Sequence, residues 1–212
     1  FVNKDYLKTA LTHRSYLNEH KTATEHNERL EFLGDAVLEL VVTEHLYLNY
    51  QNPEGDLTNW RSALVKTETI SNISNQLKIG DFLLMSRGEA KSFGRSRQLL
   101  LANAYEAVIG AIYLDQGFEG AKNFIERTLI GKLKQIITEK LYLDAKSNFQ
   151  EVSQEREGIT PHYEVLKETG PDHDKIFTVG VFVGEKKWAQ GVGPSKQIAQ
   201  QRAAEEALKK YH

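Results

Sequence analysis

The chain has 212 residues, 40% hydrophobic and 26% charged, with a formal net charge of −2, which allows one or two domains with packed cores. It contains no cysteine, which excludes disulfide bonds and thiolate metal sites and fits a reducing cytoplasm. We find no secretory hydrophobic region and no apolar run long enough to cross a membrane, so we expect a cytoplasmic protein without a membrane partner.

Charge is distributed evenly along the chain. Residues 1–142 carry 17 basic and 18 acidic side chains, and residues 143–212 carry 10 and 11. Neither half has the basic excess that marks many nucleic-acid-binding domains. Any binding of phosphates must therefore depend on local lysines and arginines, supported by metal ions and helix N-termini.

The periodicity of apolar residues divides the chain into two regions. Helical periodicity extends to about Lys140, and the pattern then changes to one helix, three alternating strands and a final helix that begins near Ser195. The strands are predicted at residues 162–167, 176–183 and 187–192. We therefore predict an all-α domain over residues 1–142 and a small α+β domain of order α-β-β-β-α over residues 143–212.

The first long predicted helix has an acidic side and an apolar side. At about 100° per residue, the acids lie within about a quarter of the circumference: Glu28, Glu31, Asp35 and Glu39. The apolar side contains Leu30, Leu33, Val37, Leu40 and Val41. An ordinary amphipathic helix with a solvated acidic face gives the same spacing. However, unpaired acids at i,i+4 repel each other by about 0.2 to 0.5 kcal/mol per pair, and a bound divalent cation would relieve this repulsion.

A second predicted helix, over residues 99–114, is apolar on nearly every side and carries one charged residue, Glu106. A buried carboxylate without a partner is costly, so Glu106 must be salt-bridged, protonated or bound to a metal ion. Asn103 lies one turn earlier on the same face. If the two helices pack together, four oxygen ligands suited to Mg²⁺ or Mn²⁺ would converge: Glu31, Asp35, Asn103 and Glu106.

Five ordered segments resemble the ribonuclease III family, the metal-dependent endonucleases of double-stranded RNA. The segment Asn27-Glu28-Arg29-Leu30-Glu31-Phe32-Leu33-Gly34-Asp35-Ala36-Val37-Leu38 resembles the sequence hallmark of the family. The other segments agree in order and spacing: residues 10–16, residues 55–58 with 61–65, residues 86–89 and residues 101–115. The likeness covers nearly the whole chain.

The resemblance implies a metal-assisted hydrolysis of phosphodiester bonds in double-stranded RNA. It implies Mg²⁺, which Mn²⁺ can replace, with Asp35 and Glu106 as the catalytic residues and Glu31 and Asn103 as orienting ligands. Glu68 and Glu89 are either outer ligands or ordinary surface acids. The products implied are 5′ phosphates with short 3′ overhangs, formed during the processing of rRNA and mRNA.

Asn103 departs from the pattern of the family, which usually has an aspartate one turn before the glutamate. The amide oxygen can still bind a metal ion, but the site loses one negative charge, so we expect weaker metal binding. The alternative function is therefore a double-stranded-RNA-binding protein in which Asn103 disables or weakens cleavage.

Residues 144–211 resemble the double-stranded-RNA-binding domain. The resemblance places Gln150 and Glu151, on the first helix of this domain, in one minor groove, and His173, in the loop after the first strand, in the next. Ser195 and Lys196 open the last helix and would face the phosphates between these grooves. We expect recognition of duplex shape rather than of base sequence.

Phe32 projects from the acidic side of its helix, where a large aromatic ring needs a cover. A loop of the same chain or a partner subunit could provide one. In the ribonuclease III family the equivalent side chain inserts into the partner, so the resemblance predicts a homodimer with Phe32 at its interface.

Overall fold

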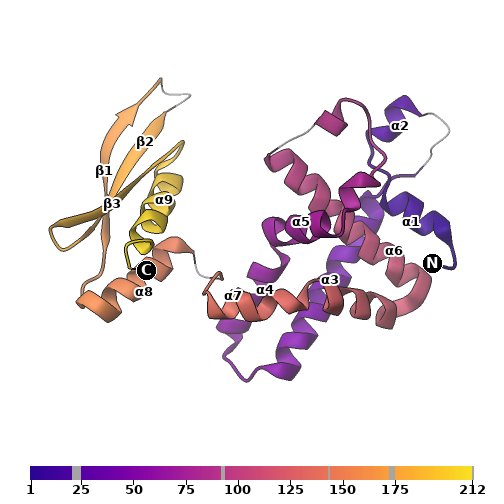
Figure 1. Ribbon diagram of the computed structural model, residues 1–212, viewed down its shortest axis with the longest axis horizontal. Coiled ribbons are helices and arrows are strands. Elements are labelled where there is room, and N and C mark those ends of the chain that lie inside the picture. The colour runs from indigo at the N-terminus through magenta and orange to yellow at the C-terminus, as the bar shows by residue number, and fades with distance from the viewer. Residues whose placement is uncertain (21–24, 92–93, 143, 172–174, 212) are drawn as a thin grey trace. The chain divides into compact units, whose positions relative to one another are not determined.

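The computed structural model divides into two units, Phe1–Glu139 and Lys140–His212, which are described separately (Figure 1). The structure describes residues 1–20, 25–91, 94–142, 144–171 and 175–211. From the sequence we predicted the boundary between residues 142 and 143, and the contacts within the chain separate at Glu139 and Lys140.

The first unit is helical. Its α-helices are α1 (Lys4–Ala10), α2 (Tyr16–Glu19), α3 (Glu28–Asn49), α4 (Glu54–Val65), α5 (Thr67–Gln76), α6 (Arg95–Thr128) and α7 (Leu133–Thr138). Three short 3-10 helices join them: η1 (Ile79–Asp81), η2 (Glu89–Lys91) and η3 (Ile130–Lys132). Helix α6 bends at Gly117, whose positive φ of 74° interrupts the helical backbone.

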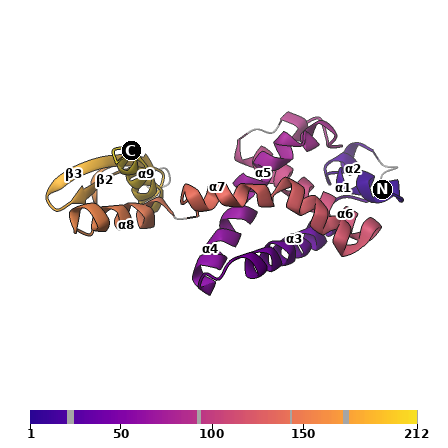
Figure 2. The same cartoon turned by 60° about the horizontal axis from the view of Figure 1, so that its bottom comes forward.

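Helices α3 and α6 form the central packing of this unit, and Figure 2 shows them crossing. They approach so closely because a glycine of each helix lies against the backbone of the other. A Cβ atom on Gly34 would lie 1.8 Å from the backbone oxygen of Glu106, and one on Gly110 would lie 2.2 Å from that of Leu30. Only glycine permits this approach, and it holds the two helices in one register.

The buried side of α3 agrees with most of the predicted apolar side. Leu30, Val37 and Val41 are buried, Leu33 is half-buried, and Leu40 is 56% exposed. Leu40 lies at the edge of the predicted apolar side, and this end of the apolar side is therefore not part of the core.

The second unit has the order α-β-β-β-α, as predicted. Its elements are α8 (Ala145–Glu157), β1 (His162–Thr169), β2 (Ile176–Val183), β3 (Lys186–Gly193) and α9 (Lys196–Leu208). The strands form one antiparallel sheet in the order β1-β2-β3. Helix α9 packs on β2 and β3, and α8 packs on α9.

Small residues let α9 lie close to the sheet. A Cβ atom on Gly191 of β3 would lie 2.4 Å from the backbone oxygen of Ala199, and Ala199, Ala203 and Ala207 are fully buried. Phe149 of α8 completes this core. The close packing sets the position of Ser195, the N-cap residue of α9, and of Lys196, with which the helix begins.

We expect Gly110→Ala to destabilise the protein by about 1 to 3 kcal/mol, because the added methyl group would displace α3 from α6. Chemical denaturation monitored by circular dichroism measures this change. Gly55→Ala is the matched control, because no atom lies within 4 Å of the added Cβ near the start of α4. It should instead stabilise the protein by about 0.5 to 1 kcal/mol. Equal effects of the two substitutions would contradict this account of the helix crossing.

Candidate active site

The crossing of α3 and α6 brings the predicted acidic residues together. Gly34 lies directly against the backbone of Glu106, and Glu31 and Asp35 stand on either side of Gly34 in α3. Asn103 lies one turn before Glu106 in α6 and its side chain hydrogen-bonds to Glu31. Residues separated by about 70 positions in the sequence therefore form one cluster.

Glu106 is half-buried in a helix whose neighbouring side chains are apolar. The pKa of its carboxyl group is raised from the ordinary value of 4.5 to about 8. Burial is the larger cause of this rise, and the negative charges of Asp35 and Glu31 add to it. In the metal-free protein, Glu106 therefore carries a proton at neutral pH. A cation would favour its ionised form.

Burial also raises the pKa of Glu31, and the charges of Glu28 and Asp35 act in the same direction. The hydrogen bond from the Asn103 side chain lowers this pKa, because the amide stabilises the carboxylate form. An ionised aspartate at position 103 could only accept hydrogen bonds and could not make this contact. Asn103 thus supplies a donor to Glu31 and keeps an amide oxygen for a ligand.

The donor set fits a hard divalent cation, because all four side chains present carboxylate or amide oxygens. Within the part of the chain that the structure describes, no three acidic or histidine side chains stand close enough together to form a ready-made metal cage. The carboxylates interact electrostatically across the helix crossing. The cluster therefore supplies charge and oxygen ligands in one place.

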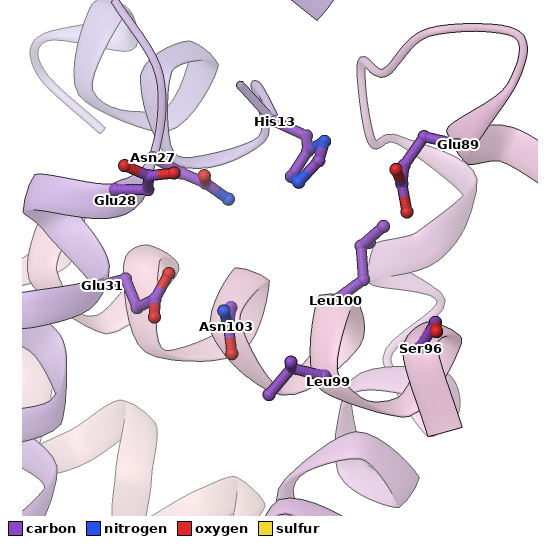
Figure 3. Close-up of a pocket in the computed structure, with 9 residues that line it drawn as sticks. All are labelled: His13, Asn27, Glu28, Glu31, Glu89, Ser96, Leu99, Leu100 and Asn103. Atoms are coloured by element: carbon purple, nitrogen blue, oxygen red, sulfur yellow. The ribbon is translucent and has the colours of Figure 1, made fainter. Parts of the chain in front are cut away.

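A cavity of about 200 Å³ adjoins this cluster and is shown in Figure 3. Glu31 and Asn103 form one wall, and His13, Asn27 and Glu89 are among the other lining residues. We predicted no role for His13 or Asn27 from the sequence, although both lie in segments that carry the family resemblance. No spacing rule would have selected them, because the residues that line the cavity come from separate parts of the chain.

Glu68 and Glu89, the two acids left open as outer ligands, differ in position. Glu89 lines the cavity. Glu68 is exposed on α5, where it pairs with Lys66 at 3.6 Å, and it is not among the residues around the cavity.

The predicted RNA-binding residues lie on the surface of the second unit, except for His173, which is outside the described residues. Gln150 and Glu151 are exposed on α8. The Ser195 side chain caps α9 by accepting a hydrogen bond from the backbone N–H of Ile198 at 3.2 Å. Lys196 is exposed and contacts Glu168 at 3.4 Å.

Phe32 is 81% exposed, so no described segment of the chain covers it. Three further apolar side chains share its side of α3 at helical spacing and are also exposed: Ala36, Leu40 and Tyr47. Together they form an exposed apolar stripe along the helix.

Comparison with known proteins shows similarity along nearly the whole chain. Residues 3–133 match a family model described as Ribonuclease-III-like, and residues 145–211 match one described as Double-stranded RNA binding motif. Ribonuclease 3 of Borreliella burgdorferi is 45% identical over 210 residues, covering 99% of this chain and 86% of that protein. Ribonuclease 3 of Carboxydothermus hydrogenoformans is 47% identical over 210 residues, covering 98% of this chain and 89% of that protein.

A solved structure of the nuclease domain of ribonuclease III from Campylobacter jejuni is also similar. It shares 45% sequence identity with a TM-score of 0.54, covering 60% of this chain and 90% of that one. That structure is described as showing flexibility in a region involved in dimer formation of the domain. In this chain, no helix among the described residues is both long and apolar enough to span a membrane.

The raised pKa of Glu106 predicts how the stability of the metal-free protein depends on pH. The folded protein holds a proton that the unfolded chain releases above about pH 4.5, so the stabilising contribution of Glu106 is full below that pH and is lost as pH rises to about 8. The slope is at most about 1.4 kcal/mol per pH unit for one proton. In Glu106→Gln the slope should become smaller, with the remainder due to Glu31.

Urea denaturation in a chelating buffer at several pH values from 5 to 8.5 measures this slope. Glu119→Gln, which removes an exposed acid from the same helix, is the control and should behave as the unsubstituted chain does. An unchanged slope in Glu106→Gln would show that Glu106 does not hold the proton.

Proposed function

Because the chain belongs to the ribonuclease III family and is an endoribonuclease with a double-stranded-RNA-binding domain, we propose that it hydrolyses phosphodiester bonds of double-stranded RNA with Mg²⁺. Membership of the family suggests a divalent metal cofactor in general. The observation that carries the proposal is the electrostatic interaction of Glu31 and Asp35 with Glu106 across the helix crossing at Gly34.

Glu31, Asp35, Asn103 and Glu106 would hold the cation, and Mn²⁺ could take its place. When bound, the cation polarises the scissile phosphate and lowers the pKa of a water molecule. Asp35 and Glu106 are the residues that catalysis requires, because they supply charge where the two helices meet. Glu106 gives up its proton on metal binding, since its carboxyl group is protonated in the metal-free protein at neutral pH.

The hydrogen bond from Asn103 favours the ionised form of Glu31, and so opposes the burial and the neighbouring charges that raise the pKa of that carboxyl group. This contact supports Asn103 as an orienting ligand that reduces the charge of the site while preserving its arrangement. Relative to a site with four carboxylates, we expect lower metal affinity and retained cleavage.

In the second unit, the exposed Gln150 and Glu151 on α8 and the N-terminus of α9 are available to a duplex. The N-terminus of α9 attracts phosphate, and Lys196 adds a positive charge beside it. The ion pair of Lys196 with Glu168 is exposed, so releasing it costs less than about 1 kcal/mol. The role of His173 in the next minor groove stays a prediction.

We also propose a homodimer that buries the exposed apolar stripe of α3 around Phe32. A large exposed aromatic side chain beside other apolar residues is typical of a protein interface. Dimer formation is also described for the nuclease domain of the Campylobacter jejuni protein. A dimer would place two sites on one duplex and allow cleavage of both strands.

The proposed products are 5′ phosphates with short 3′ overhangs, and the proposed substrates are precursors of rRNA and mRNA. The cytoplasmic location stays a prediction.

Cleavage of an end-labelled RNA duplex tests the hydrolytic site. We expect the chain to cut with Mg²⁺ and not with Ca²⁺, and Glu106→Gln to reduce kcat by at least about 100-fold because a charged ligand is lost. Asn103→Asp should lower the Mg²⁺ concentration needed for half-maximal rate, since it restores a charge.

If only Asn103→Asp cuts, the chain is a duplex binder disabled at this position. If none of the three proteins cuts any duplex, the proposed hydrolytic site is wrong.

Phe32→Ala should weaken the dimer by at least about tenfold in Kd, because a truncated interface aromatic commonly costs about 2 kcal/mol or more. Sedimentation velocity over a range of concentrations measures this change. Phe82→Ala removes another exposed phenylalanine outside α3 and should leave the mass unchanged. A dimer of equal strength in Phe32→Ala would exclude Phe32 from the interface.

A further inference from the structure

Among the polar side chains that line the cavity beside Glu31 and Asn103, two that can donate hydrogen bonds from a ring or an amide have no part in the hydrolytic mechanism. These are His13, from the segment between α1 and α2, and Asn27, from the residue before α3. Figure 3 shows both side chains directed into the cavity, opposite the wall that Asn103 forms. They are therefore placed to contact whatever enters it.

Asn27 is 4% exposed, and its side chain lines the cavity. It occupies the N-cap position of α3 without capping the helix, because its backbone has a helical conformation there. A largely buried amide that does not cap its helix and that faces a cavity is placed to exchange hydrogen bonds with a ligand there. The amide offers both donors and an acceptor.

The neighbours of His13 determine which ring nitrogen faces the cavity as a donor. The backbone N–H of Ser15 donates to Nδ1 at 3.3 Å, so Nδ1 is an acceptor in the neutral ring and Nε2 carries the proton. The Ser15 hydroxyl lies 2.8 Å from Nδ1 and accepts a hydrogen bond from the backbone N–H of Ser86 at 3.0 Å. Its own hydrogen is therefore free to point at Nδ1. These contacts hold the ring and leave Nε2–H as a donor without a partner among the described residues.

The chemistry of the cavity favours a neutral hydroxyl group over an anion. Glu28, Glu31 and Glu89 contribute carboxyl groups to its lining, which disfavours a phosphate inside it. A hydroxyl can accept a hydrogen bond from His13 while it exchanges one with the amide of Asn27. The volume of about 200 Å³ lies below the roughly 300 to 1,000 Å³ of pockets for drug-sized ligands, and so suits a single sugar.

The geometry points to a ribose subsite in the nuclease unit, in which His13 and Asn27 bind the 2′-hydroxyl of a nucleotide next to the scissile phosphate. The inference rests on the proposed function, because the cavity shares Glu31 and Asn103 with the hydrolytic cluster. The 2′-hydroxyl is the group that distinguishes RNA from DNA. The nuclease unit would then select ribose at the cleavage site independently of the RNA-binding unit.

The test combines single-atom changes in the substrate with side-chain changes in the full chain. A series of RNA duplexes is prepared, each with a single 2′-deoxyribose at a different position around the scissile bond. Cleavage of each duplex is measured for the unsubstituted chain and for His13→Ala, His13→Gln and Asn27→Ala. His45→Gln is the control, since His45 lies on α3 outside the cavity. Thermal melting shows which variants remain folded. If Asn27→Ala fails to fold, the two His13 variants decide the outcome.

We expect one 2′-deoxy position to reduce kcat/KM of the unsubstituted chain about tenfold, the loss of a hydrogen bond at a buried site. His13→Ala should reduce kcat/KM about tenfold on the all-ribose duplex. With the duplex that is 2′-deoxy at the sensitive position, His13→Ala should cause no further reduction of kcat/KM. His13→Gln should recover most of the activity, because its amide N–H can replace Nε2–H. Equal losses on every duplex, or no 2′-deoxy position that couples to His13, would overturn the subsite.

A binding measurement separates failure of the subsite from failure of the proposed function. The dissociation constants of the same duplexes are measured with Ca²⁺, which tests the subsite without cleavage. If no protein cuts RNA, the proposed function fails, and coupling between His13 and one 2′-hydroxyl in these constants would still support the subsite. Absence of coupling in binding as well as in cleavage would overturn it.

Discussion

The close crossing of α3 and α6 is the contact on which the rest of the nuclease unit depends. Gly34 and Gly110 remove the side chains that would separate the helices, and each touches the backbone of the other helix. Because Glu31 and Asp35 flank Gly34, this contact also sets their distance from Glu106. The same two glycines thus determine both the stability of the core and the arrangement of the acidic cluster. A substitution that separates the helices would therefore affect the site and the stability of the fold together.

This arrangement concentrates negative charge where water is partly excluded. Burial of the Glu106 carboxyl group, and then its repulsion by Asp35 and Glu31, raise its pKa to about 8. The repulsion among the carboxylates is reduced in the metal-free protein because Glu106 is protonated there. Asn103 moderates the repulsion, since it replaces a charge with a hydrogen bond to Glu31. The departure from the usual aspartate is therefore compatible with an ordered site.

In the proposed function the two units have different parts. The second unit offers exposed polar residues on α8 and the N-terminus of α9, held in place by the close contact of Gly191 with α9. Such a surface would read duplex shape over a long span. The first unit would supply the charged cluster and the adjoining cavity at the scissile bond. Binding along the duplex would then raise the local concentration of scissile bonds at the cluster.

The sequence by itself determined the helical and mixed parts of the chain, the three strands, and the identity of the acidic residues in α3 and α6. These follow from local periodicity and from the cost of a lone carboxyl group, Glu106, in an apolar helix. Tertiary structure decided which surfaces meet: it exposed Leu40, left Phe32 uncovered by the described chain, and placed Glu68 away from the cavity. It also brought His13 and Asn27 to Glu31, because contacts between segments distant in sequence depend on packing that no local pattern encodes.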